Sequence, residues 1–222
     1  MSELAVPLDA DRIELTGRLR EHLPGWVDTD RALMDLAERF ADFGRSAVLL
    51  KAVAINALYS TNVYAVARHV ESTLAETDVG RAGPDLVEQL ARPTLRKPRR
   101  FHAFAAKFAH FFIDAERFPI LDSYAERMVE LHLGRQNVHR DKAYRYVAFV
   151  RNFQALNRLA GWSGTTRTLD QFLWLAGQYR EWQRNPSVEI NAETKALFEH
   201  PPRDAQADLD ALLPGDQRGV HL

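Results

Sequence analysis

The chain has 222 residues, a formal net charge of −1 and 46% hydrophobic residues. These values are typical of a soluble globular protein, and they exclude a surface that attracts nucleic acid by net charge alone. The sequence contains no cysteine, which excludes disulfide bonds, cysteine nucleophiles and cysteine metal sites, and fits a cytoplasmic protein. It has neither a run of about 18 apolar residues nor a basic N-terminal leader, so we expect no membrane span and no signal peptide.

Apolar residues recur at helical spacing along nearly the whole chain, which predicts an all-α protein. Pro24 and Gly25 separate the first two expected helices, and Ser60, Thr61 and Asn62 interrupt the longest apolar segment. The expected helices cover 9–22, 28–43, 46–74 as two helices, 84–91, the segment around Lys107, Asp122 to Gly134, 140–160 and 168–182. We expect residues 1–200 to form a single all-α domain, followed by a polar tail, 201–222, whose composition favours disorder.

Lys107 is one of only five lysines in a chain with 29 Lys+Arg, and it lies in the most aromatic stretch, FHAFAAKFAHFFI. Burial among phenylalanines disfavours the ammonium, so we expect the pKa of Lys107 to be lowered. A lysine with a lowered pKa can act as an amine nucleophile, whereas arginine stays protonated. The alternative is structural: the lysine buries its stem and keeps its amine in water.

Asp122 follows fifteen residues later, at the end of the otherwise apolar run FPILDS. A lysine and an aspartate in apolar surroundings at consecutive helices form a plausible catalytic pair. The alternative for Asp122 is that it caps the N-terminus of the helix that follows. His102 and His110 are expected to pack or to reach the solvent edge rather than to bind metal, because no carboxylate lies beside them at ligand spacing.

The segments FAAKFAHFF and FPILDSYAERM, with the basic connection ARPTLRKPRR before them, resemble the helix-hairpin-helix DNA glycosylase superfamily, most closely its 8-oxoguanine DNA glycosylase-like branch. The resemblance covers residues 47–182 and includes ALYSTNVYAVARHV, which is similar to a helix pair that carries a DNA-contacting residue. It implies a helical glycosylase fold with a cleft between two helical layers. One difference is that residues 92–106 contain no glycine, although the hairpin of that superfamily has glycines.

The resemblance implies an excision reaction on double-stranded DNA with a damaged or modified base. Lys107 would attack the sugar C1′ of a flipped nucleotide and form a Schiff base, and Asp122 would stabilise the positive charge that develops on the sugar. The phosphate-contacting residues would be Arg96, Lys97, Arg99 and Arg100, while Asn62 would bond a phosphate or fill the gap left by the flipped base. The base pocket would be lined by Gln171, Phe172 and Trp174.

This chemistry needs no metal and no organic cofactor. A monomer is favoured as the oligomeric state. Two other functions stay open from the sequence: a non-catalytic nucleic-acid-binding module on the same helical fold, and a protein-interaction module with no nucleic-acid role. The missing hairpin glycines favour these two, and the isolated Lys107 and Asp122 favour the enzyme.

Overall fold

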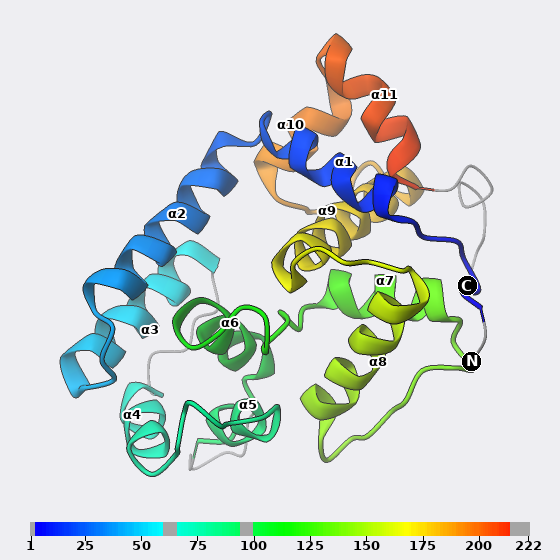
Figure 1. Cartoon of the computed structure of the whole chain (residues 1–222). Helices are drawn as coiled ribbons and strands as arrows, with labels where there is room; N and C mark the ends of the chain where they lie inside the picture. The colour runs from blue at the N-terminus through cyan, green and yellow to red at the C-terminus, as the bar shows by residue number, and fades with distance from the viewer. Residues whose placement is uncertain (1–2, 60–65, 94–99, 214–222) are drawn as a thin grey trace. The chain divides into compact units, whose positions relative to one another are not determined.

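The computed structural model describes residues 3–59, 66–93 and 100–213, and all regular secondary structure in these ranges is α-helical (Figure 1). The all-α prediction is therefore confirmed. The helices are α1 (Ala10–Arg20), α2 (Pro24–Arg39), α3 (Arg45–Tyr59), α4 (Ala67–Ala75), α5 (Asp85–Leu90), α6 (His102–Phe112), α7 (Ser123–Leu133), α8 (Arg145–Leu159), α9 (Thr166–Arg184), α10 (Ala192–Glu199) and α11 (Arg203–Leu212). Within the described ranges no helix combines the length and the apolar character needed to cross a membrane.

The chain divides into two compact units, where the sequence predicted a single domain. Unit 1 comprises Met1–Asp28, Asp122–Val138 and Asn152–Leu222, and unit 2 comprises Thr29–Leu121 and His139–Arg151. Each unit is therefore assembled from segments far apart in the sequence. Two of the four unit boundaries fall inside α2 and α8, and the other two fall in the connections before and after α7.

In unit 1, α9 packs against both α1 and α7, and α11 packs against α1 (Figure 1). The close approach of α7 and α9 depends on Gly177, because a Cβ at this position would lie 2.7 Å from the Cβ of Tyr124. Polar side chains begin these helices: Thr165 caps α9, and Asn191 caps α10. Sequence-encoded caps and one small residue thus fix where the helices start and meet.

Residues 203–212 form α11, although the sequence analysis assigned them to a polar tail with disorder favoured. Ala205, Leu209 and Leu212 are buried, and their spacing places them on one face of the helix. On the exposed side, Nε of Arg18 on α1 donates to Asp208 over 2.7 Å. This short apolar stripe lets the segment form a packed helix despite its polar average composition.

In unit 2, α6 is the central helix, packed by α3 and α5. Every residue from Phe104 to Phe112 is buried, so α6 has no solvent-facing side over this length. A helix that is apolar on all sides is stable only when neighbouring elements cover it. Lys107 lies in the middle of this buried stretch, so its surroundings decide whether unit 2 contains a functional site.

Candidate functional site

The side chain of Lys107 is buried, with 8% of the residue surface exposed, and its amine meets an aromatic ring of α3. Nζ lies 4.8 Å from the centroid of the Tyr59 ring, within the range of a cation–π interaction. The hydroxyl of Tyr59 donates to Oδ1 of Asp30 over 3.3 Å, and Asp30 on α2 is itself only 5% exposed. Helices α2, α3 and α6 thus bring a carboxylate, a phenol and an amine together inside unit 2.

Unit 2 contains a second buried lysine, Lys51 on α3, which the sequence analysis did not single out. Its Nζ donates to the carbonyl of Asp42 over 2.8 Å and lies 4.3 Å from the Phe43 ring centroid. Burial lowers the pKa of Lys51. The signal was available, since Lys51 interrupts the apolar run LLKAVAI just as Lys107 interrupts its aromatic run. The bond to a backbone carbonyl gives Lys51 a structural role at the start of α3.

Asp122 is the N-cap of α7, which is the structural role expected for it as the alternative to catalysis. Its Oδ1 accepts from the backbone N–H groups of Tyr124 and Ala125, both over 2.9 Å. Oδ2 takes no part in this cap, so one carboxylate oxygen stays outside the helix start. Asp122 belongs to unit 1 and Lys107 to unit 2, and the pairing of the two stays a prediction.

Four of the predicted DNA-contacting residues lie outside the described ranges: Asn62, Arg96, Lys97 and Arg99. Arg100 is described, and it is exposed. Its Nη1 donates to the backbone carbonyls of Lys142 and Ala143 over 2.7 and 3.2 Å. Arg100 therefore anchors one end of the basic connection on the segment before α8.

The two ends of the connection between α5 and α6 are held by a buried carboxylate, Glu88, which is 2% exposed. Its oxygens accept from Nη2 of Arg92 over 3.0 Å, from Nε2 of His102 over 2.9 Å and from the backbone N–H of Tyr146 over 2.6 Å. The backbone N–H of Phe101 also donates to the carbonyl of Ala91 over 2.9 Å. A helix, a pinned connection and a second helix follow one another here, without the glycines of the expected hairpin.

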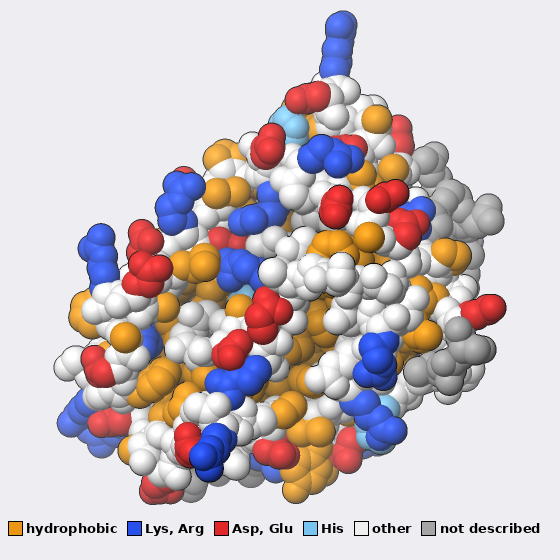
Figure 2. All heavy atoms as spheres, viewed as in Figure 1, with side chains coloured by type: hydrophobic (Ala, Val, Ile, Leu, Met, Phe, Trp, Pro, Cys, Tyr) orange, Lys and Arg blue, Asp and Glu red, His pale blue; other side chains and the backbone are white. Residues whose placement is uncertain are grey.

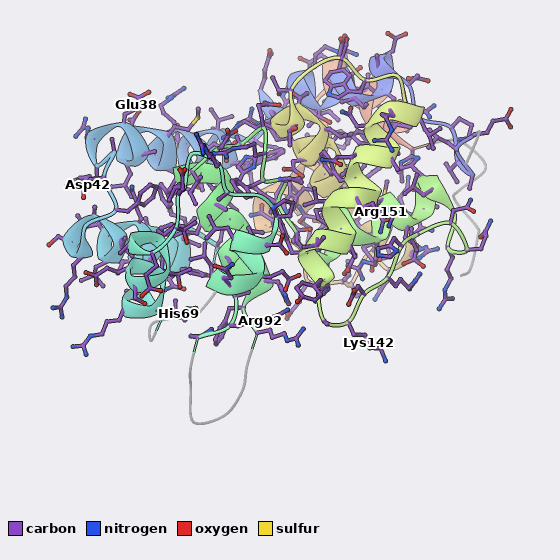
Figure 3. All side chains as sticks on the ribbon, turned by 60° about the horizontal axis from the view of Figure 1, so that its bottom comes forward. Glu38, Asp42, His69, Arg92, Lys142 and Arg151 are labelled. Atoms are coloured by element: carbon purple, nitrogen blue, oxygen red, sulfur yellow. The ribbon has the colours of Figure 1, made fainter. Side chains whose placement is uncertain are left out.

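Basic side chains lie around this pinned connection. Arg92 is bonded to the carbonyl of Ala143, and His69 to the carbonyl of Gln89 over 2.9 Å. Figure 3 shows His69, Arg92 and Lys142 along the lower edge of the view. Elsewhere basic and acidic side chains are interspersed on the face drawn in Figure 2, as a net charge of −1 leads one to expect. The edge around the connection is therefore the best local candidate for contact with phosphates.

Two of the three predicted base-pocket residues lie together in unit 1. The rings of Trp174 and Trp26 have centroids 4.5 Å apart, and the Arg20 guanidinium lies 4.9 Å from the Trp26 ring. Nη1 of Arg20 donates to Oε1 of Gln171 over 3.4 Å. The backbone N–H of Trp26 is held by Glu193 of α10 over 3.0 Å. This half-buried group of Arg20, Trp26, Gln171 and Trp174 offers an aromatic surface edged by polar groups, and the sequence analysis missed Arg20 and Trp26.

Phe172, the third predicted base-pocket residue, lies in the interior of unit 1 and is fully buried. Its ring centroid is 6.1 Å from that of His132 on α7. Its neighbours Gln171 and Trp174 are half-buried on other sides of α9, because successive residues of a helix point in different directions. Contact between Phe172 and a flipped base stays a prediction, and it requires the residues packed over this side of α9 to move away.

Within the described residues no three His, Cys, Asp or Glu side chains gather closely enough to hold a metal ion. The two histidines of α6 have internal partners. His102 contacts Glu88, and Nδ1 of His110 lies 3.0 Å from the carbonyl of Phe118. Both histidines are buried packing residues of unit 2.

Residues 13–116 match a family model described as HI_0787_N, N-terminal domain. The matched range runs from α1 to the residues after α6, and it includes Asp30, Tyr59 and Lys107 but not Asp122. No curated protein matches the chain. No solved structure matches it either.

Proposed function

We propose that the chain is a DNA glycosylase that excises a damaged or modified base from double-stranded DNA, with AP lyase activity through Lys107. The observation that carries the proposal is the buried lysine amine on α6, the helix that directly follows the pinned basic connection. The proposal also takes the helix-hairpin-helix glycosylase fold, with its cleft between helical layers, as the finer description of this all-α chain. The support for that finer description is the resemblance of residues 47–182.

In the proposed reaction the target nucleotide is first extruded from the duplex, because C1′ is otherwise out of reach. Nζ of Lys107, as the neutral amine, attacks C1′, and the bond from C1′ to the base nitrogen breaks. The base leaves with the bonding electrons and takes up the proton that the amine gives up. Opening of the sugar ring at C1′ then yields a Schiff base between Lys107 and C1′.

Asp122 has the role of stabilising the positive charge that develops on the sugar. Its Oδ1 caps α7, which fixes the carboxylate in place. Arg96, Lys97, Arg99 and Arg100 are proposed to contact phosphates, and Asn62 to contact a phosphate or fill the vacated base position. Gln171, Phe172 and Trp174 are proposed to receive the base, with stacking on Trp174 supported by its half-buried ring.

Borohydride trapping tests this proposal. The substrates are duplexes with an abasic site, 8-oxoguanine or uracil, and the Schiff base is reduced to a stable covalent adduct. Wild type is expected to form an adduct, and Lys107→Met to form none. Lys51→Met is the matched control, because Lys51 is the other buried lysine of unit 2 and its amine is bonded to the Asp42 carbonyl. An adduct that survives in Lys107→Met, or no wild-type adduct on any duplex, would overturn the proposal.

A second candidate function, a non-catalytic interaction module, is favoured by the apolar surface of α2 and α3. Six large apolar residues on or next to these helices are more than a third exposed: Met34, Phe40, Leu49, Leu50, Val53 and Leu58. Such a group of exposed residues is typical of a binding surface. A nucleic-acid-binding module predicts DNA affinity that Arg100→Ala weakens and Lys107→Met leaves intact, whereas a protein-interaction module predicts no salt-dependent affinity for DNA.

A further inference from the structure

Three helices of unit 2 contribute one side chain each to a row that runs from buried Asp30 through half-buried Tyr59 to buried Lys107. The Tyr59 hydroxyl donates to Oδ1 of Asp30 over 3.3 Å. The face of the same ring lies 4.8 Å from Nζ of Lys107. Asp30 and Lys107 are both at least nine-tenths buried. The resemblance that suggested Lys107 gave no role to Asp30 or Tyr59.

We propose that Asp30 and Tyr59 are positioning residues for the Lys107 amine, with Asp30 fixing the tyrosine ring and the ring fixing Nζ. This inference rests on the proposed function, because it assigns a task to two residues of the same site. A buried carboxylate is costly unless hydrogen bonds compensate it, so a purely packing role for α2 at this point would favour an apolar residue over Asp30.

The ring can fix the amine because it is itself held from more than one side. Its hydroxyl is bonded to Asp30, and the ring centroid lies 5.8 Å from that of Phe111 on α6. A lysine side chain has four rotatable bonds, and nucleophilic attack requires its amine at one place. The attraction between the ring face and the ammonium contributes to that restraint.

Lys51 shows what a structural lysine looks like in the same unit. Its Nζ donates to the backbone carbonyl of Asp42 over 2.8 Å, which ties the amine to the turn before α3. The residue is fully buried, whereas Lys107 keeps 8% of its surface exposed. Lys51 is therefore the more fully enclosed of the two lysines, which makes it the structural reference for Lys107.

The first test measures the rate of borohydride trapping on an abasic duplex for wild type, Tyr59→Phe and Asp30→Asn. Tyr59→Phe keeps the ring and removes the hydroxyl, and Asp30→Asn keeps the shape and removes the charge. At saturating duplex we expect the trapping rate to fall about tenfold to a hundredfold in each variant. The duplex concentration at half-saturation should stay within about twofold, because neither residue is proposed to touch DNA. Asp78→Asn, at an exposed position of unit 2, is the control for the charge change.

The second test needs no DNA. Limited reductive methylation with formaldehyde and cyanoborohydride, followed by peptide mass spectrometry, gives the labelling rate of Lys107 relative to exposed Lys142. We expect the ratio to rise at least about threefold in Tyr59→Phe and in Asp30→Asn, because a ring that is no longer held by the hydrogen bond to Asp30 restrains the amine less. The two variants should thus be more reactive toward a small aldehyde and less reactive toward the sugar. A general loosening of unit 2 would also raise the labelling of buried Lys51, whereas release of the Lys107 amine alone would not.

The outcomes separate the two proposals. Equal trapping rates in wild type and both variants, or an unchanged methylation ratio, would overturn the positioning role. If wild type forms no adduct on any duplex, the proposed function fails, and the methylation ratio alone decides whether Asp30 and Tyr59 hold the amine. Each variant must have a melting temperature within a few degrees of wild type. Tyr59→Leu, which removes the ring, should raise the methylation ratio further.

Discussion

His132 should make the stability of unit 1 fall steeply in mild acid. The residue lies in the interior on α7, where Nδ1 is 3.0 Å from the carbonyl of Val6. Among the described residues Nε2 has no hydrogen-bond partner. Burial is the main cause that lowers the pKa of His132 from 6.5 to about 4. The folded protein therefore resists a proton that the unfolded chain accepts readily.

The sign and the size follow from this difference. Above pH 6.5 the imidazole is neutral in both states and adds no pH dependence. Between pH 6.5 and about 4 the unfolded state binds more protons, so the free energy of unfolding drops by about 1.4 kcal/mol per pH unit. The loss reaches about 2 kcal/mol at pH 5 and levels off near about 3 kcal/mol below pH 4.

Urea unfolding at pH 7 and pH 5 measures this loss. The reference is His132→Gln, whose amide can still donate to the Val6 carbonyl but does not titrate. The other seven histidines contribute equally to the pH dependence of wild type and variant, so their contributions cancel in the comparison. We expect the pH-dependent loss of unfolding free energy to be about 2 kcal/mol larger in wild type than in His132→Gln. Equal losses would refute the reasoning, because they would mean that His132 is protonated in the folded protein as easily as in the unfolded chain.

Three further predictions concern packing and ion pairs. Glu88→Ala should lower the free energy of unfolding by about 3–5 kcal/mol in urea titrations, because His102 and the backbone N–H of Tyr146 lose the buried carboxylate that accepts their hydrogen bonds. A loss as small as that of the exposed control Gln89→Ala would contradict this. Gly177→Ala should cost about 1–3 kcal/mol and lower the melting temperature, since its Cβ would lie 2.7 Å from the Tyr124 Cβ; an unchanged melting temperature would show that α7 and α9 can separate freely. A double-mutant cycle on Arg18 and Asp208 should give a coupling below about 1 kcal/mol that salt weakens, because the Arg18 side chain is 59% exposed; a larger, salt-independent coupling would argue for a buried pair.

Helix positions were predictable where local chemistry decides them. Asp122 and Gly134 mark the two ends of α7 as expected, whereas α2 begins at Pro24, before the expected start at residue 28. These residues act through caps and turns that depend on their immediate neighbours. The buried position of Lys107 followed from its aromatic surroundings for the same reason.

What the sequence could not predict depends on contacts between distant segments. The division into two units is not visible in the composition, because two of its four boundaries lie inside α2 and α8. Asp30 reads as an ordinary surface residue of an amphipathic helix, and only the approach of Tyr59 explains its burial. Helix α10 was missed because its 8 residues are too few to show a clear helical period, and its place is fixed by contacts such as Glu193 with the start of α2.

The pairing of α1 with α11 has a consequence for synthesis of the protein in the cell. Arg18 and Asp208 are separated by 190 residues, and Leu15 and Leu19 of α1 are buried in the finished protein. At typical translation speeds the ribosome needs about 10–40 s to make the intervening chain. During that interval the apolar side of α1 has emerged before its partner helix exists. The apolar side of α1 is therefore open to chaperone binding until α11 has been made.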